Sequence, residues 1–172
     1  RAAAVTVRAQ GAYERNLARI EDAYTADEIL AGGGVTGGLA DKLRAKVKEA
    51  LVATGDGARV LPVPAGVVRG DGSVPTQAEA TALAVLALEG DKDAPLADLG
   101  AALLGGYSPS WGWGDGRTNL VCMQAVLRLF KDPIQAGVKI TLTMAGKPVA
   151  AGALDQARLR EVLALDVEAP GL

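Results

Sequence analysis

The stretch that most constrains the fold runs from Pro75 to Phe130, because it holds two strongly apolar segments of helical length, each preceded by a glycine-rich loop. The first segment, 80–88, is apolar at every position except Thr81. A helix without a polar face has to be buried on all sides. The second, 119–131, keeps only a narrow polar line. Both segments are therefore predicted to be inner helices of a helical core.

The flanking residues place the ends of these two helices. Thr76 and Glu79 have the spacing of a capping box, in which the hydroxyl and the carboxylate satisfy the first free amides of a helix. Gly90 is predicted to end that helix as a left-handed cap. Asp115 or Thr118 is suited to cap the second helix, and Asp132-Pro133 stops it.

Two other segments are predicted to be outer helices. Leu39 to Leu51 has apolar residues on one face and mixed charges on the other, and the segment after Pro95 has a narrow leucine stripe. Residues 1–30 predict one or two further helices, with Gly11 as the weak point, and residues 59–75 predict a long irregular loop. The order outer, inner, outer, inner predicts an incomplete α/α toroid of antiparallel helix pairs, which continues upstream of Arg1 or ends in an exposed edge.

After Pro133 the apolar period changes from helical to two. Residues 138–144 alternate apolar and polar side chains, as in a half-buried strand. A turn at 145–147, a strand over 148–154 and a third over 159–167 complete a predicted β-meander. The fold class is thus mainly α with a small β part, with a helical domain over 1–132 and an incomplete β-segment over 133–172.

Composition excludes several classes of function. The net charge of −2 gives no attraction to nucleic acid. There is no histidine and a single cysteine, so the commonest general base and zinc ligand are missing. The apolar runs are shorter than the about 20 residues of a membrane span. We therefore expect no catalytic residues, no cofactor, no metal, no nucleic-acid partner and no direct membrane span.

Few residues are candidates for a site. Tyr107, Trp111 and Trp113 lie in a glycine-rich loop, where aromatic rings form either a ligand platform or a plug for the end of the core; we favour the plug and keep the three as possible contact residues. Arg69-Gly70-Asp71 spells the integrin tripeptide, but Gly72 favours a turn. Turn chemistry is also the preferred explanation for the glycine-flanked carboxylates, which are Asp56, Asp71 and Asp115.

The paired motifs resemble a known family. The sequence TQAEATALAVLAL, then an outer helix, then GWGDGRTNLVCMQAVLRLF and a strand of type VKITLTMAGKPV, is similar to the end of the thioester domain of bacterial α2-macroglobulins. In that family the corresponding stretches read like E-x-T-A-x-x-L-L-A-L and G-G-W-G-S-T-Q-x-T-x-x-A-L-x-A-L. The resemblance covers about 38–172 and implies that the β-segment belongs to a CUB-like sheet.

The resemblance implies a protease-trapping surveillance protein, located in the periplasm, in the cell envelope or outside the cell. Its partners would be proteases, through the full-length protein, and other domains of the same chain. In the family a Cys-Gly-Glu-Gln thioester acylates the attacking protease, and this chain lacks that motif. Cys122 is more consistent with an inert core thiol. The chain, which starts at Arg1 without an initiator methionine, is expected to be a catalytically silent piece of the trap.

Two alternatives remain open. An α/α-toroid enzyme of the terpene-cyclase or prenyltransferase type has the same helix order, but it needs aspartate-rich motifs or a zinc site, and neither occurs here. The third possibility is a helical-repeat binding module without chemistry.

Overall fold

A computed structural model describes residues 2–130 and 138–154, with no account of the side chains of residues 2, 3 and 154. The described part is mainly α with a small β part, as the sequence predicts, and this β part consists of two small antiparallel sheets. The chain divides after Leu129 into two compact units. The helical elements are α1 (Ala2–Arg15), a short 3-10 helix (Leu17–Arg19), α2 (Ala23–Ala31), α3 (Gly37–Ala50), α4 (Gln77–Ala87), α5 (Leu96–Gly105) and α6 (Gly116–Leu129).

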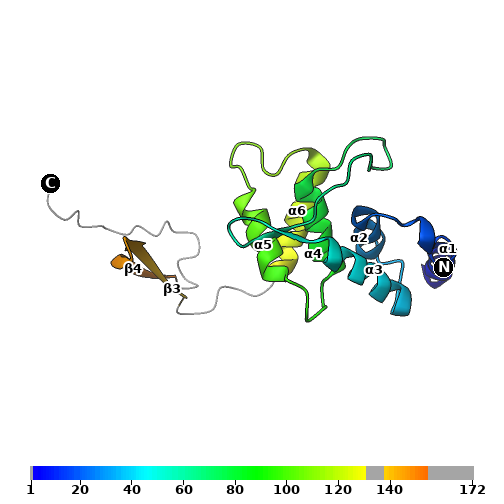
Figure 1. The fold of residues 1–172 in the computed structure, drawn as a ribbon, viewed down its shortest axis with the longest axis horizontal. Helices are drawn as coiled ribbons and strands as arrows, with labels where there is room; N and C mark the ends of the chain where they lie inside the picture. The colour runs from blue at the N-terminus through cyan, green and yellow to red at the C-terminus, as the bar shows by residue number, and fades with distance from the viewer. Residues whose placement is uncertain (1, 131–137, 155–172) are drawn as a thin grey trace. The chain divides into compact units, whose positions relative to one another are not determined.

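Helix α4 lies at the centre of the first unit, with α2, α5 and α6 packed against it and α3 against α2 (Figure 1). Its residues from Glu79 to Val85 are all buried, which confirms the prediction of a helix covered on every side. Gly90 adopts a φ of 84° in the following turn, the left-handed conformation expected there.

The outer helices also follow their sequence patterns. Helix α3 buries Leu39, Leu43 and Val47 and exposes its charged side. Helix α5 buries Leu99 and Leu103 from its leucine stripe. Amphipathic spacing is sufficient to orient these two helices, because each has one wet face.

The second apolar helix differs from its prediction. Helix α6 begins at Gly116, three residues earlier than predicted, and it buries only Thr118, Cys122 and Ala125. Leu120 is 60% exposed and Leu127 is 64% exposed. Within the described residues, the prediction that this segment is a second inner helix is therefore wrong. The apolar circumference of α6 indicates that it needs cover, but the described residues of the first unit do not cover its outer side.

The first thirty residues break at a different point from Gly11. Helix α1 passes through that glycine, and the break occurs after Arg15, where the side-chain Nδ2 of Asn16 donates to the carbonyl of Ala12 over 2.8 Å. Between α3 and α4 the chain forms a small hairpin, with Val52 to Ala53 (β1) antiparallel to Arg59 to Val60 (β2). Strand β2 contacts α4 and α5, which anchors the start of the long loop that leads to α4.

The second unit contains a β-hairpin at the predicted position. Strand β3 (Val138–Met144) pairs antiparallel with β4 (Lys147–Leu154), and an irregularity lies between Leu142 and Thr143. Ala145 and Gly146 have positive φ in the predicted turn. Leu142 and Met144 are about half exposed, so strand β3 is wetter than its alternating pattern predicts. The predicted third strand, 159–167, lies outside the described residues.

Candidate functional site

The most elaborate polar arrangement in the described chain surrounds the carboxylate of Glu79, at the N-terminal end of α4. The amide of Glu79 donates to the Thr76 hydroxyl over 3.0 Å, which is the first half of the predicted capping box. The carboxylate does not form the second half. It is fully buried and faces two guanidinium groups instead.

Two arginines and a tyrosine donate to this carboxylate. Arg69, from the loop before α4, donates through Nε to Oε2 over 2.8 Å and also pairs through Nη2. Arg117, in the first turn of α6, donates through Nε to Oε1 over 2.7 Å. The Tyr24 hydroxyl of α2 donates to the same Oε1 over 3.0 Å. Glu79 thus joins three helices and one loop. We call Tyr24, Arg69, Glu79 and Arg117 the Glu79 cluster.

Further polar contacts surround the cluster. Arg69 Nη2 lies 2.9 Å from Asp115 Oδ2, and Nη1 donates to the Ser73 hydroxyl over 3.0 Å. Arg117 also pairs with Glu28 of α2. Asp115 caps α6, because its carboxylate accepts the amide of Thr118 over 2.8 Å. The sequence had left Asp115 and Thr118 as alternative caps.

The hydrogen bonds and charges of the cluster keep the carboxylates of Glu79 and Asp115 ionised. Burial alone would raise the pKa of Glu79, but hydrogen bonds from Arg69, Arg117 and Tyr24 outweigh it and hold the pKa below its ordinary value. Burial and the bond to Glu79 raise the pKa of Tyr24. The amide of Thr118 and the guanidinium of Arg69 lower the pKa of Asp115 to about 2. A carboxylate that is ionised and already holds three donors is poorly suited to be a general base.

The same contacts show whether the integrin-like tripeptide, 69–71, is a binding motif or a turn. Arg69 is only 7% exposed, so its guanidinium is not available to a partner. Asp71 accepts from the amide and hydroxyl of Ser73, and the amide of Gly72 donates to the Arg69 carbonyl over 2.9 Å. The turn prediction is confirmed. Asp56 behaves in the same way, since it accepts from Thr54 and Ala58 within its own turn.

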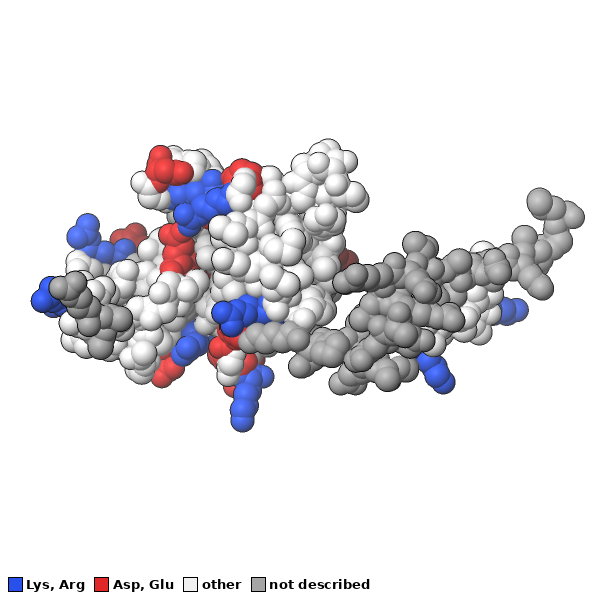
Figure 2. All heavy atoms as spheres, turned by 180° about the vertical axis from the view of Figure 1, so that it is seen from behind, with Lys and Arg blue, Asp and Glu red and all other residues white. Residues whose placement is uncertain are grey.

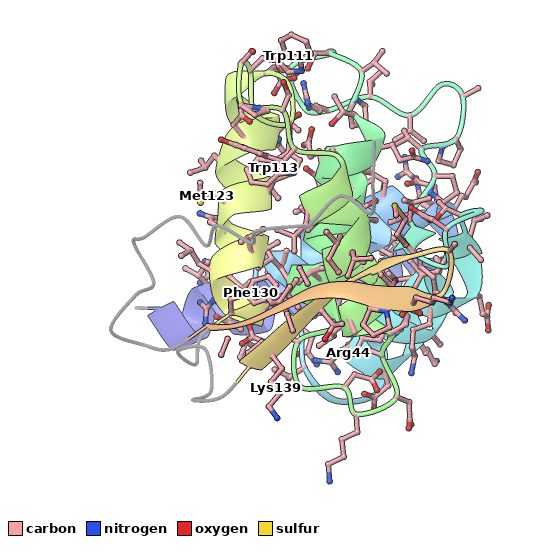
Figure 3. All side chains as sticks on the ribbon, turned by 90° about the vertical axis from the view of Figure 1, so that its left-hand side faces the viewer. Arg44, Trp111, Trp113, Met123, Phe130 and Lys139 are labelled. Carbon is pink, nitrogen blue, oxygen red and sulfur yellow. The ribbon has the colours of Figure 1, made fainter. Side chains whose placement is uncertain are left out.

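The three aromatic residues of the 105–116 loop have different environments. The indole N–H of Trp113 donates to the Leu103 carbonyl over 2.6 Å, and its ring lies 4.8 Å from that of Tyr107. Trp113 therefore packs on the end of the core, as the plug prediction requires. Trp111 lies at the outer end of the loop and is 71% exposed, and Tyr107 is 50% exposed (Figure 3). The plug prediction is wrong for Trp111, and a contact role for these residues stays a prediction.

Asn119 fixes the shape of this loop. Its side-chain oxygen accepts the amide of Trp113 over 2.7 Å, and its nitrogen donates to the Gly114 carbonyl over 2.9 Å. Ser108 and Gly112 exchange two backbone hydrogen bonds of 2.8 and 2.7 Å. The exposed Trp111 is therefore carried on a tightly bonded turn.

Cys122 is buried on the inner side of α6, with Sγ 3.5 Å from the Ala78 carbonyl. Burial raises the pKa of its thiol to about 12. A thiol that stays protonated and covered has little reactivity. Gln124, two residues on, is exposed, so the superficial thioester-like pair points in different directions.

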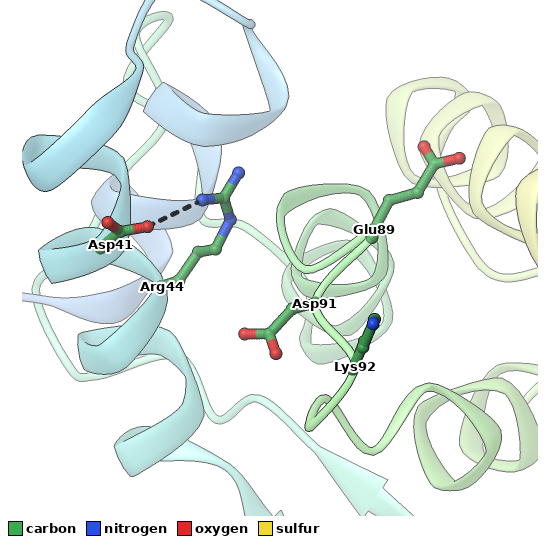
Figure 4. A pocket seen from close by; sticks show the side chains of 6 residues that line it. Asp41, Arg44, Glu89, Asp91 and Lys92 are labelled. Carbon is green, nitrogen blue, oxygen red and sulfur yellow. Dashed lines mark hydrogen bonds and ion pairs between the residues drawn. The ribbon is translucent and has the colours of Figure 1, made fainter.

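A pocket of about 490 Å³ lies between α3 and the turn after α4 (Figure 4). Its charged lining residues are Asp41, Arg44, Glu89, Asp91 and Lys92. Arg44 pairs with Asp41 over 3.3 Å, and Asp91 with Lys48 over 2.7 Å. On the visible face of the helical unit, acidic and basic side chains also lie next to one another, and much of the rest of that face is uncharged (Figure 2). Paired charges of both signs select no ligand class.

Within residues 2–130 and 138–154, no group of acidic or cysteine side chains is arranged to hold a metal ion. No helix in the same ranges is long and apolar enough to cross a membrane. Comparison with protein-family models, curated proteins and solved structures found no match.

Sequence reasoning missed the Glu79 cluster. Its members are 10, 38 and 55 positions from Glu79, and no local period connects them. The available signal was a glutamate in the first turn of the helix, directly before the apolar run 80–88, because a charge next to a buried segment needs a partner.

Proposed function

We propose that this chain is a non-catalytic helical segment, with an adjoining CUB-like β-segment, of an α2-macroglobulin-like protein that traps proteases. On this proposal the helices belong to an α/α toroid and the strands to a larger β-meander. The chain works in the periplasm, in the cell envelope or outside the cell, and its role is to hold the trap's architecture.

The observation that carries the proposal is the contact between the two stretches that resemble the family. Glu79 comes from the first motif and Arg117 from the second, and the buried carboxylate of Glu79 forms an ion pair of 2.7 Å with the partly exposed guanidinium of Arg117. Thr81, also in the first motif, accepts the amide of Leu61 over 3.1 Å and so fixes the preceding loop. Residues that carry a sequence resemblance and also interlock in space are best explained by a shared architecture.

The packing of α4 is consistent with a toroid. An inner helix of such an array has neighbours on both sides and an outer partner, and α4 is covered by α2, α5 and α6. The exposed apolar side of α6 is the place where a further helix pair would continue the array.

The chemistry of the trap lies elsewhere in the full-length protein on this proposal. A thioester needs a cysteine and a glutamine side chain in contact, whereas Cys122 is buried and Gln124 is exposed. The segment contributes rigidity, and the Glu79 cluster is its main internal brace.

The test uses the full-length protein that contains this chain. After incubation with trypsin, we expect the protease to lose activity on a large protein substrate while it keeps activity on a small peptide. Glu79→Gln in the full-length protein should reduce the trapped fraction, because the brace is weakened, whereas the exposed Asp93→Asn should leave it unchanged.

Two results would contradict the proposal. One is equal inhibition of the protease on large and small substrates, which indicates an ordinary active-site inhibitor. The other is turnover of a prenyl diphosphate with magnesium, which indicates the toroid-enzyme alternative.

A further inference from the structure

The strongest unexplained feature outside the Glu79 cluster is the carboxyl group of Asp27, in the middle of α2. Asp27 has no exposed surface, and neither carboxyl oxygen has a hydrogen-bond donor among the described residues. Other buried polar side chains of this unit, such as Glu79 and Thr118, are bonded to partners. Helix α2 packs against both α3 and α4, so the carboxyl is enclosed in the helical core.

The backbone N–H of Glu28 favours a negative charge on Asp27, but the charged groups around it do not. Glu28 and Asp22 lie next to it on α2, and Glu79 approaches from α4; all three are acids. From α3, the ammonium group of Lys46 donates to the Glu21 carbonyl, just before α2, over 3.1 Å. An unpaired buried carboxylate costs several kcal/mol, so such a group keeps its proton instead.

Helix α2 is also mechanically connected to the Glu79 cluster. Tyr24 lies one turn before Asp27 and donates to Glu79, and Glu28 follows Asp27 and pairs with Arg117. A displacement of α2 therefore removes one donor from Glu79 and one acid from Arg117 at the same time.

We propose that α2 is a pH-dependent latch: Asp27 is uncharged in the folded chain at neutral pH, and loss of its proton to solvent releases α2 from α3 and α4 before the rest of the helical unit unfolds. The latch closes toward acidic pH and loosens toward alkaline pH. The proposal is independent of the protease-trap function, since it concerns only the chain's own packing.

The pKa of Asp27 has the direction that the latch requires. Burial, followed by the negative charges of Glu28, Asp22 and Glu79, outweighs the backbone N–H of Glu28 and raises the pKa to about 10. In the unfolded chain the pKa is close to 4. Between these values the folded state holds one proton more than the unfolded state, so stability falls as pH rises.

Hydrogen exchange on the full chain tests the latch. We compare amides of α2 with amides of α4 from pH 6 to pH 9, after correction for the intrinsic exchange rate. The protection of α2 should fall by up to about tenfold per pH unit, and α4 should stay at least about tenfold more protected. Asp27→Asn should remove the pH dependence, and Asp93→Asn should retain it.

Two outcomes would overturn the latch: an unchanged slope in Asp27→Asn, or equal protection of α2 and α4 at every pH, which means global unfolding without a separate opening of α2. A second measurement needs no variant. The carboxyl carbon of Asp27, followed by NMR in the wild-type chain, should not titrate below pH 6. If it titrates near pH 4 with the exposed aspartates, Asp27 is charged at neutral pH and the proposal fails.

Discussion

Glu79 concentrates much of the specificity of the helical unit in one side chain. It is fully buried and holds donors from Arg69, Arg117 and Tyr24, which come from a loop and two other helices. Removal of one partner from a buried ion pair is far more costly than loss of a surface pair, because the remaining charge stays desolvated.

We therefore expect Glu79→Gln to lower the free energy of unfolding by about 3 kcal/mol. Urea unfolding followed by far-UV circular dichroism measures this change. Asp93→Asn, which removes an exposed carboxylate, should change the free energy by less than about 0.5 kcal/mol. A loss of similar size in both variants would mean that the buried cluster contributes no more than surface charge.

Gly112 is a second residue whose identity the structure requires. Its φ is 67°, and a Cβ there would collide with the side-chain amide of Asn119, which holds the loop. Gly112→Ala should destabilise the chain by about 1–3 kcal/mol. Gly105→Ala is the matched control, because a Cβ at that position meets no atom. Tryptophan fluorescence should shift in the first variant only, and an unshifted spectrum there would contradict the role of Asn119.

At the scale of elements, the described residues of the helical unit pack only against the inner side of α6. Cys122 lies on that side under α4, and it is the chain's single cysteine. With its pKa raised to about 12, the thiol is almost entirely protonated at pH 8. Alkylation by iodoacetamide, followed by mass spectrometry, should be at least about 1,000-fold slower in the native chain than in concentrated urea. Comparable rates would show that α6 is not docked.

The N-terminus of α6 should make the chain sensitive to acid. The folded pKa of Asp115 is about 2, below its value in the unfolded chain, because the Thr118 amide and Arg69 favour the carboxylate. Its stabilising contribution is therefore complete above about pH 4 and is lost as pH falls toward 2. Asp115→Asn should flatten the loss of thermal stability over this range. A profile identical to that of the wild type would assign the acid sensitivity to other carboxylates, such as Glu79.

The helices show what local sequence can predict. The run from Ala80 to Leu88 predicts burial correctly, because a helix that is apolar on all sides has no polar face to turn toward solvent. The same reasoning fails for α6: Leu120 and Leu127 are exposed, since periodicity records the need for cover and not whether the chain provides it. The Glu79 cluster was unpredictable for a related reason, because its pairings depend on which helix ends meet in space.

At the scale of the whole molecule, the two compact units have unequal cores. Buried leucines, alanines and valines from α2, α3, α4 and α5 form one continuous cluster in the unit that ends at Leu129. The described part of the second unit is a single hairpin whose apolar residues Leu142 and Met144 are about half exposed. An isolated two-stranded hairpin is at best marginally stable in water.

The difference between the two cores predicts which of the two units folds when it is produced alone. A chain that ends at Asp132 should unfold cooperatively, with a melting temperature within about 3 °C of that of the full chain. A shift of this size corresponds to a change in the free energy of unfolding of less than about 1 kcal/mol. A peptide of residues 138–154 should show no cooperative transition. Circular dichroism on the three chains measures both expectations. If the shortened chain loses its helicity, the helical unit depends on residues after Asp132, and the hairpin is then part of its stability; a cooperative transition in the peptide would instead assign the hairpin a stability of its own.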